Sequence, residues 1–175
     1  MGLDAGSGLI AAILVTSDRA ARGQYEDLTG PALAAFLVER GWQVREVRVV
    51  PDDRAAIAQV LSAWCDAGPP GLVLTAGGTG LGPRDVTPEA TREILEKDLP
   101  GLPELMRSRG SAKTPRAALS RAAAGCRGAC LVVNLPGSPR GAVESLECVL
   151  DLIPHALEML RGGGHGEKEG HHDHS

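Results

Sequence analysis

The segment LTAGGTGLGPRDVTPEAT, residues 74–91, determines how the rest of the chain must be arranged. Its apolar start predicts the end of a strand, and its last residues predict a helix that begins at Pro88 with Thr87 as the N-cap. The loop between them is unusually rich in glycine, which lets a backbone turn tightly and approach a ligand closely. These glycines are Gly77, Gly78, Gly80 and Gly82.

Asp85 lies between the glycines and the expected helix, two residues before the cap. Loops lined with backbone N–H groups bind anions, and a carboxylate beside such a loop can hold the metal that accompanies phosphates. Asp85 could instead cap the turn that leads into the helix. The loop is not a P-loop, because Pro83 and Arg84 follow where that motif requires Lys and Ser or Thr.

Continuous apolar or β-branched runs on both sides of this segment predict buried strands. The expected strands cover residues 9–16, 43–50, 71–75 and 129–134. Helical patterns lie between and after them, so the connections are of the βαβ type and the sheet is mostly parallel. The expected helices cover residues 29–41, 54–67, 88–97, 103–109 and 117–123, followed by a long helix from Pro139 that Pro154 must kink or split.

Polar residues follow each of these strands, at the sheet edge where α/β proteins bind their ligands. Ser17 and Asp18 follow the first strand, Asp52 and Asp53 the second, and residues 134–138 the last. The two aspartates of residues 52–53 could be helix caps. Asp52 beside an anion-binding loop could instead form a Mg²⁺ site with a bound polyphosphate, which favours phosphoryl or nucleotidyl transfer.

Composition restricts the function of this chain of 175 residues. Aromatic residues make up 2% and the net charge is −4, so the chain offers no stacking platform for nucleic acid and no general nucleic-acid interface. Residues 107–140 are basic and contain no acid, which fits either a solvated face or a rim for an anionic substrate. Four cysteines without zinc spacing, no signal peptide and no membrane-spanning run predict a cytoplasmic protein.

The boundaries expected from composition are a disordered N-terminus at residues 1–8, a single α/β domain at 9–162, and a disordered Gly/His-rich tail at 163–175. The histidines of that tail could bind a metal, or the tail could have no such role.

Three motifs resemble the molybdopterin adenylyltransferases, a family that includes the bacterial MogA-type proteins, the G domain of gephyrin and a domain of the plant molybdenum-insertion protein. They are TAGGTG at residues 75–80, PRDVTPEAT at 83–91 and NLPGSP at 134–139. The resemblance covers residues 9–161. It implies a three-layer α/β/α MogA-like fold, usually a homotrimer. From the composition we expect no nucleic-acid partner and no membrane association.

The resemblance also implies adenylyl transfer from Mg-ATP to the terminal phosphate of molybdopterin, with release of pyrophosphate. The two essential aspartates of the family map to Asp52 and Asp85, which are expected to hold Mg²⁺. Arg84 or a cation of residues 107–140 is expected to offset the developing charge. The family's pterin pocket maps to Ser17, Asp18, Gly77, Gly78, Thr79, Gly80, Ser120, Pro136, Gly137 and Ser138.

Two other functions remain open at this point. The same fold occurs in relatives that bind the pterin without adenylylating it and in the molybdate-insertion module. For an adenylyltransferase, a molybdate-insertion protein is the expected recipient of the product. A competence-damage-type relative hydrolyses nucleotide pyrophosphates, but such proteins usually carry a further C-terminal domain.

Overall fold

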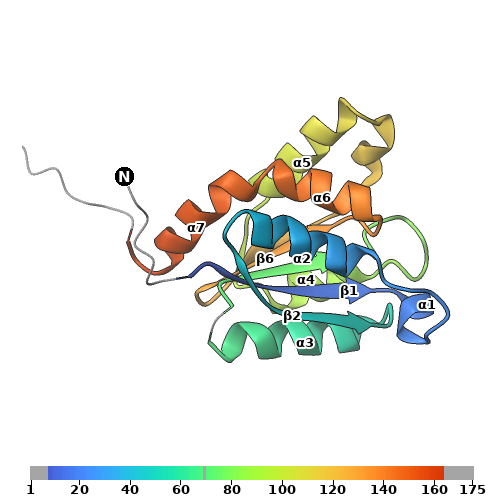
Figure 1. Ribbon diagram of the computed structural model, residues 1–175, viewed down its shortest axis with the longest axis horizontal. Coiled ribbons are helices and arrows are strands. Elements are labelled where there is room, and N and C mark those ends of the chain that lie inside the picture. Colours follow the sequence, from blue (N-terminus) through green and yellow to red (C-terminus); the bar gives the residue numbers. More distant parts are fainter. Residues whose placement is uncertain (1–7, 69, 164–175) are drawn as a thin grey trace, which may run out of the picture.

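A six-stranded sheet lies between two layers of helices in the computed structural model, which describes residues 8–68 and 70–163 (Figure 1). The strand order is β2-β1-β3-β6-β5-β4. Strands β2, β1, β3 and β6 are parallel, β5 pairs antiparallel with β6, and β4 pairs antiparallel with β5. The strands are β1 (Ile10–Thr16), β2 (Gln43–Val50), β3 (Leu72–Ala76), β4 (Lys97–Asp98), β5 (Ala124–Arg127) and β6 (Cys130–Leu135). The mostly parallel α/β sheet predicted from the sequence is confirmed.

The helices pack on both faces of this sheet. They are α1 (Asp18–Ala21), α2 (Thr29–Glu39), α3 (Arg54–Asp66), α4 (Thr87–Ile94), α5 (Gly101–Ser111), α6 (Pro139–Glu147) and α7 (Ile153–Leu160), with 3₁₀ turns η1 (Pro115–Leu119) and η2 (Leu150–Leu152). Helices α2, α5, α6 and α7 share one apolar core with the sheet, and α3 and α4 share the other (Figure 1). Strands β1, β3 and β6 are buried along nearly all their length because helices cover both faces.

The parallel strands end level with one another. Thr16 pairs with Val50, and Ala76 pairs with Leu135. The loops that follow these strands therefore lie side by side at one edge of the sheet. The first residue of β1 and the last residues of α7 lie at the opposite edge (Figure 1).

Two short strands were not expected. Residues 117–123 were predicted as helix, but η1 ends at Leu119 and β5 begins at Ala124. The helix predicted to reach residue 97 ends at Ile94, because Leu95 adopts an extended ψ of 140° and the chain enters β4. Gly125 makes this pairing possible, since a Cβ at that position would collide with the carbonyl oxygen of Lys97.

The predicted cap of α4 was wrong, because Thr87 is the first residue of that helix. Residues 18–21 form a short helix that the sequence did not indicate. Asp27 caps α2, because its carboxylate accepts the N–H groups of Thr29 and Gly30. The predicted break near Pro154 is confirmed, with η2 between α6 and α7.

The predictions for residues 1–7 and for the tail at 164–175 lie outside the described residues. Within the described ranges, no helix is long and apolar enough to cross a membrane.

Candidate active site

The glycine loop turns directly after β3 and is fixed at its start by glycine conformations. Gly77 and Gly78 have positive φ values of 104° and 66°, which L side chains rarely adopt. A Cβ on Gly77 would also lie 2.5 Å from the carbonyl oxygen of Thr16. Within the described part of the chain, the N–H groups of Gly78, Thr79 and Gly80 have no intramolecular acceptor. These free donors are what an anion-binding turn requires.

Asp52 and Asp18 bind each other's backbone across the ends of β2 and β1. The Asp18 N–H donates to Asp52 Oδ2 and the Asp52 N–H donates to Asp18 Oδ1, both at 3.0 Å. Arg84 then binds Asp18 through two bonds of 3.0 Å, and this guanidinium lowers the pKa of the Asp18 carboxyl. Both carboxylate oxygens of Asp18 therefore already accept hydrogen bonds from the protein.

Asp52 differs from Asp18 because, among the described residues, no arginine forms an ion pair with it. Burial raises the pKa of Asp52, and the nearby carboxylates of Asp18 and Asp85 raise it further. Asp53, its neighbour in sequence, is the helix cap of α3 and accepts the Ala56 N–H at 2.8 Å. Each of the two interpretations of residues 52–53 therefore applies to one of the aspartates. Asp53 caps α3, and Asp52 is available to bind a ligand.

Asp85 both closes its own turn and faces a cavity. Its Oδ2 accepts the N–H of Gly82 at 2.8 Å. The turn-capping alternative is therefore real, but it occupies one carboxylate oxygen. Asp85 also lines a cavity of about 260 Å³ together with Asp52, Ser17, Gly77 and Gly78. Two carboxylates and the start of the glycine loop thus share one space.

Residues that the sequence did not single out complete this smaller cavity. They are Val15, Thr16, Ala20, Tyr25, Asp27, Thr29 and Ala76. Thr29 donates from Oγ1 to the carbonyl oxygen of Gly137 at 2.7 Å, which ties the start of α2 to the loop after β6. No sequence signal could reveal this bond, because its partners are 108 positions apart.

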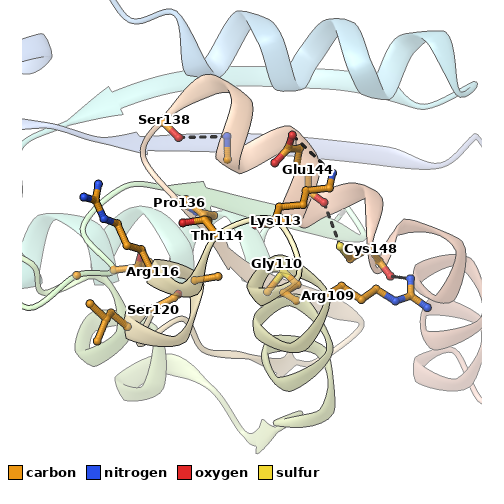
Figure 2. Close-up of a pocket in the computed structure, with 17 residues that line it drawn as sticks. Arg109, Gly110, Lys113, Thr114, Arg116, Ser120, Pro136, Ser138, Glu144 and Cys148 are labelled. Carbon is orange, nitrogen blue, oxygen red and sulfur yellow. Dashed lines mark hydrogen bonds and ion pairs between the residues drawn. The ribbon is translucent and has the colours of Figure 1, made fainter.

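A larger cavity of about 490 Å³ lies on the other side of the glycine loop, between η1 and α6 (Figure 2). Five of the predicted pterin residues line it: Thr79, Gly80, Ser120, Pro136 and Ser138. Ser138 also caps α6 by accepting the Gly141 N–H. The structure therefore distributes the predicted pocket over two adjoining cavities.

Basic residues of the segment 107–140 surround the larger cavity, but most of them already have partners. Arg109 donates to the Cys148 carbonyl oxygen at 2.8 Å, and Lys113 lies 3.6 Å from Glu144 (Figure 2). Arg116 is exposed and, among the described residues, has no hydrogen-bond or ion-pair partner. Arg116 is therefore the cation most available to an anionic ligand of this cavity.

The predicted site residues are otherwise placed as follows. Ser17 lines the smaller cavity and caps α1, since its Oγ accepts the Ala20 N–H at 3.2 Å. Gly137 lies between the two cavities, where a Cβ would come within 3.3 Å of Gly77 Cα. Asp18 is not among the residues that line either cavity within the described chain, because Arg84 and Asp52 engage it.

The smaller cavity suits Mg²⁺ carried by a polyphosphate better than a metal caged by protein. Among residues 8–68 and 70–163, no group of three or more His, Cys, Asp or Glu side chains is placed to hold a metal. Mg²⁺ is usually bound through one or two carboxylates with phosphates supplying further oxygens. Asp52 and Asp85 match that donor set, and a cation would relieve the repulsion that raises the pKa of Asp52.

Comparison with known proteins adds an independent line of evidence. The family described as "Probable molybdopterin binding domain" matches residues 12–155. A molybdopterin adenylyltransferase of Helicobacter pylori is 43% identical over 152 residues, which are 86% of this chain and 86% of that protein. The molybdopterin adenylyltransferase of Escherichia coli is 38% identical, covering 83% of this chain and 82% of that protein.

The architecture is similar to that of solved structures as well. The molybdopterin biosynthesis enzyme MoaB of Thermus thermophilus superposes with a TM-score of 0.83 and 51% identity, covering 88% of this chain and 97% of the other.

Proposed function

The chain belongs to the family of probable molybdopterin binding domains, and we propose that it is a molybdopterin adenylyltransferase of molybdenum cofactor biosynthesis. Its substrates are then ATP and molybdopterin, and its products are adenylylated molybdopterin and pyrophosphate. One observation supports this proposal most directly: Asp52 and Asp85 line a single cavity with the start of the glycine loop. Two carboxylates beside the free N–H group of Gly78 suit a metal-bound polyphosphate.

We assign the smaller cavity to the polyphosphate of Mg-ATP, with Asp52 and Asp85 as the metal ligands. We assign the larger cavity to the pterin and its phosphate, because its wall is largely apolar with a cationic rim that includes Arg116. Thr79, Gly80, Pro136 and Ser138 line this cavity next to Gly77 and Gly137 of the other. The two reacting phosphates would therefore meet at the glycine loop.

The reaction needs no covalent enzyme intermediate. A terminal phosphate oxygen of molybdopterin attacks the α-phosphorus of ATP, and the bond from that phosphorus to the oxygen bridging to the β-phosphate breaks, so that pyrophosphate leaves. Bound Mg²⁺ would neutralise charge on the phosphates. The chain itself supplies positioning and N–H donors that stabilise the charge that develops in the transition state, which are the main sources of catalysis in phosphoryl transfer.

Substitution of Asp85 tests the assignment. We expect D85A to lower the rate of adenylylation by at least about 100-fold, because a ligand of the essential metal is lost. D85N should be similarly inactive, although its amide oxygen can still accept the Gly82 N–H and keep the turn closed. Binding of molybdopterin should persist in both variants. The measurement is the formation of adenylylated molybdopterin and pyrophosphate from Mg-ATP and molybdopterin.

The same assay separates the other functions. Normal adenylylation by D85N would remove Asp85 from the mechanism. Molybdopterin binding by the wild-type protein without any adenylylated product would indicate a binding or molybdate-insertion role. Pyrophosphate or AMP released from nucleotides in the absence of molybdopterin would indicate a hydrolase.

We further propose that the protein is a homotrimer and acts in the cytoplasm, where its product passes to a molybdate-insertion protein. The free thiols of all four cysteines agree with a reducing compartment. Sedimentation equilibrium tests the assembly, since a trimer has three times the mass of the 18.1 kDa chain.

A further inference from the structure

Arg121 connects both ends of the glycine loop to the body of the protein. Its backbone N–H donates to the Thr79 carbonyl oxygen at 2.9 Å. Its side chain donates from Nε to the Gly80 carbonyl oxygen at 2.7 Å and from Nη2 to the Asp85 carbonyl oxygen at 2.8 Å. The remaining guanidinium nitrogen, Nη1, pairs with Glu89 on the first turn of α4. One planar group thus spans the loop from its phosphate-binding turn to its aspartate.

The loop depends on such an external connection because its tip is exposed. Residues 81–84 are exposed, and Leu81 has 71% of its surface accessible. Within the tip, the Asp85 N–H donates to the Gly82 carbonyl oxygen, and the Asp85 carboxylate accepts the Gly82 N–H. Those two bonds fix the shape of the turn locally. The bonds from Arg121 to Gly80 and Asp85, together with the ion pair of Arg84 with Asp18 on the other side, fix where the turn lies relative to the sheet.

Glu89 holds the guanidinium in place. Its Oε2 is buried and has no hydrogen-bond partner among the described residues, so Arg121, which pairs with Oε1, is the partner that the carboxylate has in this half-buried position. The hydrogen bond from Arg121 lowers the pKa of the Glu89 carboxyl, which shows that the pair favours the charged form. Arg121 and Glu89 therefore form a fixed pair, unlike the exposed side chain of Arg116.

We propose that Arg121 is a positioning residue that sets the distance between the phosphate-binding turn and Asp85. This inference rests on the proposed adenylyl transfer, but it assigns Arg121 a role different from offsetting charge on the substrate. Its Nε, Nη1 and Nη2 atoms each donate a hydrogen bond to an acceptor of the protein. Arg121 acts through the loop, and the loop acts on the phosphates and the metal.

R121K tests this role, because lysine keeps the charge but cannot span three acceptors with a planar fork. R127K is the matched control. Like Arg121, Arg127 forms an ion pair and donates to a carbonyl oxygen. It pairs with Asp66 through two hydrogen bonds and donates to the carbonyl oxygen of Ile94. It lies at the start of the β5–β6 turn and not at the glycine loop.

The first measurement is hydrogen–deuterium exchange of the ligand-free proteins. In R121K, we expect the hydrogen-bonded amides of this loop, those of Gly82, Asp85 and Thr87, to exchange about tenfold faster than in the wild type, while the amides of β1, β3 and β6 are unchanged. R127K should leave these three amides at the wild-type rate. Wild-type exchange of this loop in R121K, or equal acceleration in R127K, would overturn the proposal.

The second measurement is kinetic. R121K should raise the KM for Mg-ATP about fivefold or more and shift the Mg²⁺ dependence of the rate to higher concentration, while the affinity for molybdopterin stays within about twofold. E89Q, which frees the guanidinium, should show a smaller change in the same direction. Unchanged Mg²⁺ dependence in R121K would also contradict the proposal. An inactive wild-type protein would instead refute the proposed function, and the exchange experiment would still decide the role of Arg121.

Discussion

Asp52 and Asp53 illustrate at the scale of single residues how the same side chain can serve stability or function. Asp53 accepts a helix N–H and has a purely structural partner. Asp52 sits close to the carboxylates of Asp18 and Asp85, and burial together with these charges raises its pKa. Its ionised form therefore costs the folded protein stability that a bound cation would restore.

D52N should therefore stabilise the ligand-free protein and inactivate it. A carboxyl group whose pKa is raised by folding favours the folded state at low pH, and that contribution is lost as pH rises through the folded-state pKa. The asparagine oxygen can still accept the Asp18 N–H but carries no charge. We expect the thermal midpoint of D52N at pH 7 to equal or exceed that of the wild type, with the difference shrinking towards pH 4.

D53N is the control for this prediction, since asparagine is as good an N-cap as aspartate. It should retain both the wild-type midpoint and the wild-type activity. A D52N protein that is less stable than the wild type at pH 7 would show that Asp52 is needed for the fold and is not held there under repulsion.

At the scale of elements, Asn134 connects β6 to β3, to α4 and to the segment directly before β5. Its Nδ2 donates to Thr75 Oγ1 at 2.8 Å and to Thr91 Oγ1 at 2.9 Å, and its Oδ1 accepts the Ala123 N–H at 3.0 Å. Asn134 is fully buried, so it belongs to the core beneath the site although the sequence placed it in the polar edge.

N134A should consequently destabilise the fold by about 3 kcal/mol, because it leaves buried polar partners of Asn134 without hydrogen bonds. Urea unfolding measures this loss. S111A removes a comparable side-chain bond, to the Arg107 carbonyl oxygen, at an exposed position and should change stability by less than about 0.5 kcal/mol. Equal effects of the two substitutions would contradict the structural role assigned to Asn134.

The four long strands could be predicted because each is a continuous apolar or β-branched run. Strands β4 and β5 could not, since neither Lys97–Asp98 nor Ala124–Arg127 has an apolar pattern. Their pairing depends on the absence of a side chain at Gly125, next to the Lys97 carbonyl oxygen. Such a fit between distant segments leaves no periodic signal in the sequence.

At the scale of the whole molecule, the sequence predicted that four junctions meet at one edge of the sheet, because parallel strands share their direction. It could not predict that these junctions enclose two cavities. That division depends on η1 and α6 facing each other and on Thr29 holding the Gly137 carbonyl oxygen. It also could not predict that Arg84 is paired with Asp18, 66 positions away.

Ligand binding should stabilise the whole fold in a metal-dependent way. A ligand present at about 100 times its Kd stabilises a folded protein by about 2.7 kcal/mol. We expect Mg²⁺ with a non-hydrolysable ATP analogue to raise the thermal midpoint, and removal of Mg²⁺ by EDTA to abolish most of this rise. D85N should show little metal-dependent stabilisation. A rise of the same size in EDTA would indicate that the nucleotide binds without a metal.

The opposite edge of the sheet has a practical consequence. The first residue of β1 and the last residues of α7 both lie there, away from the level strand ends that carry the site (Figure 1). An affinity tag, a fluorophore or a second folded unit joined at either position would extend away from both cavities. Tethering the protein to a surface through these positions should therefore leave the mouths of the cavities open to substrates and to a protein that collects the product.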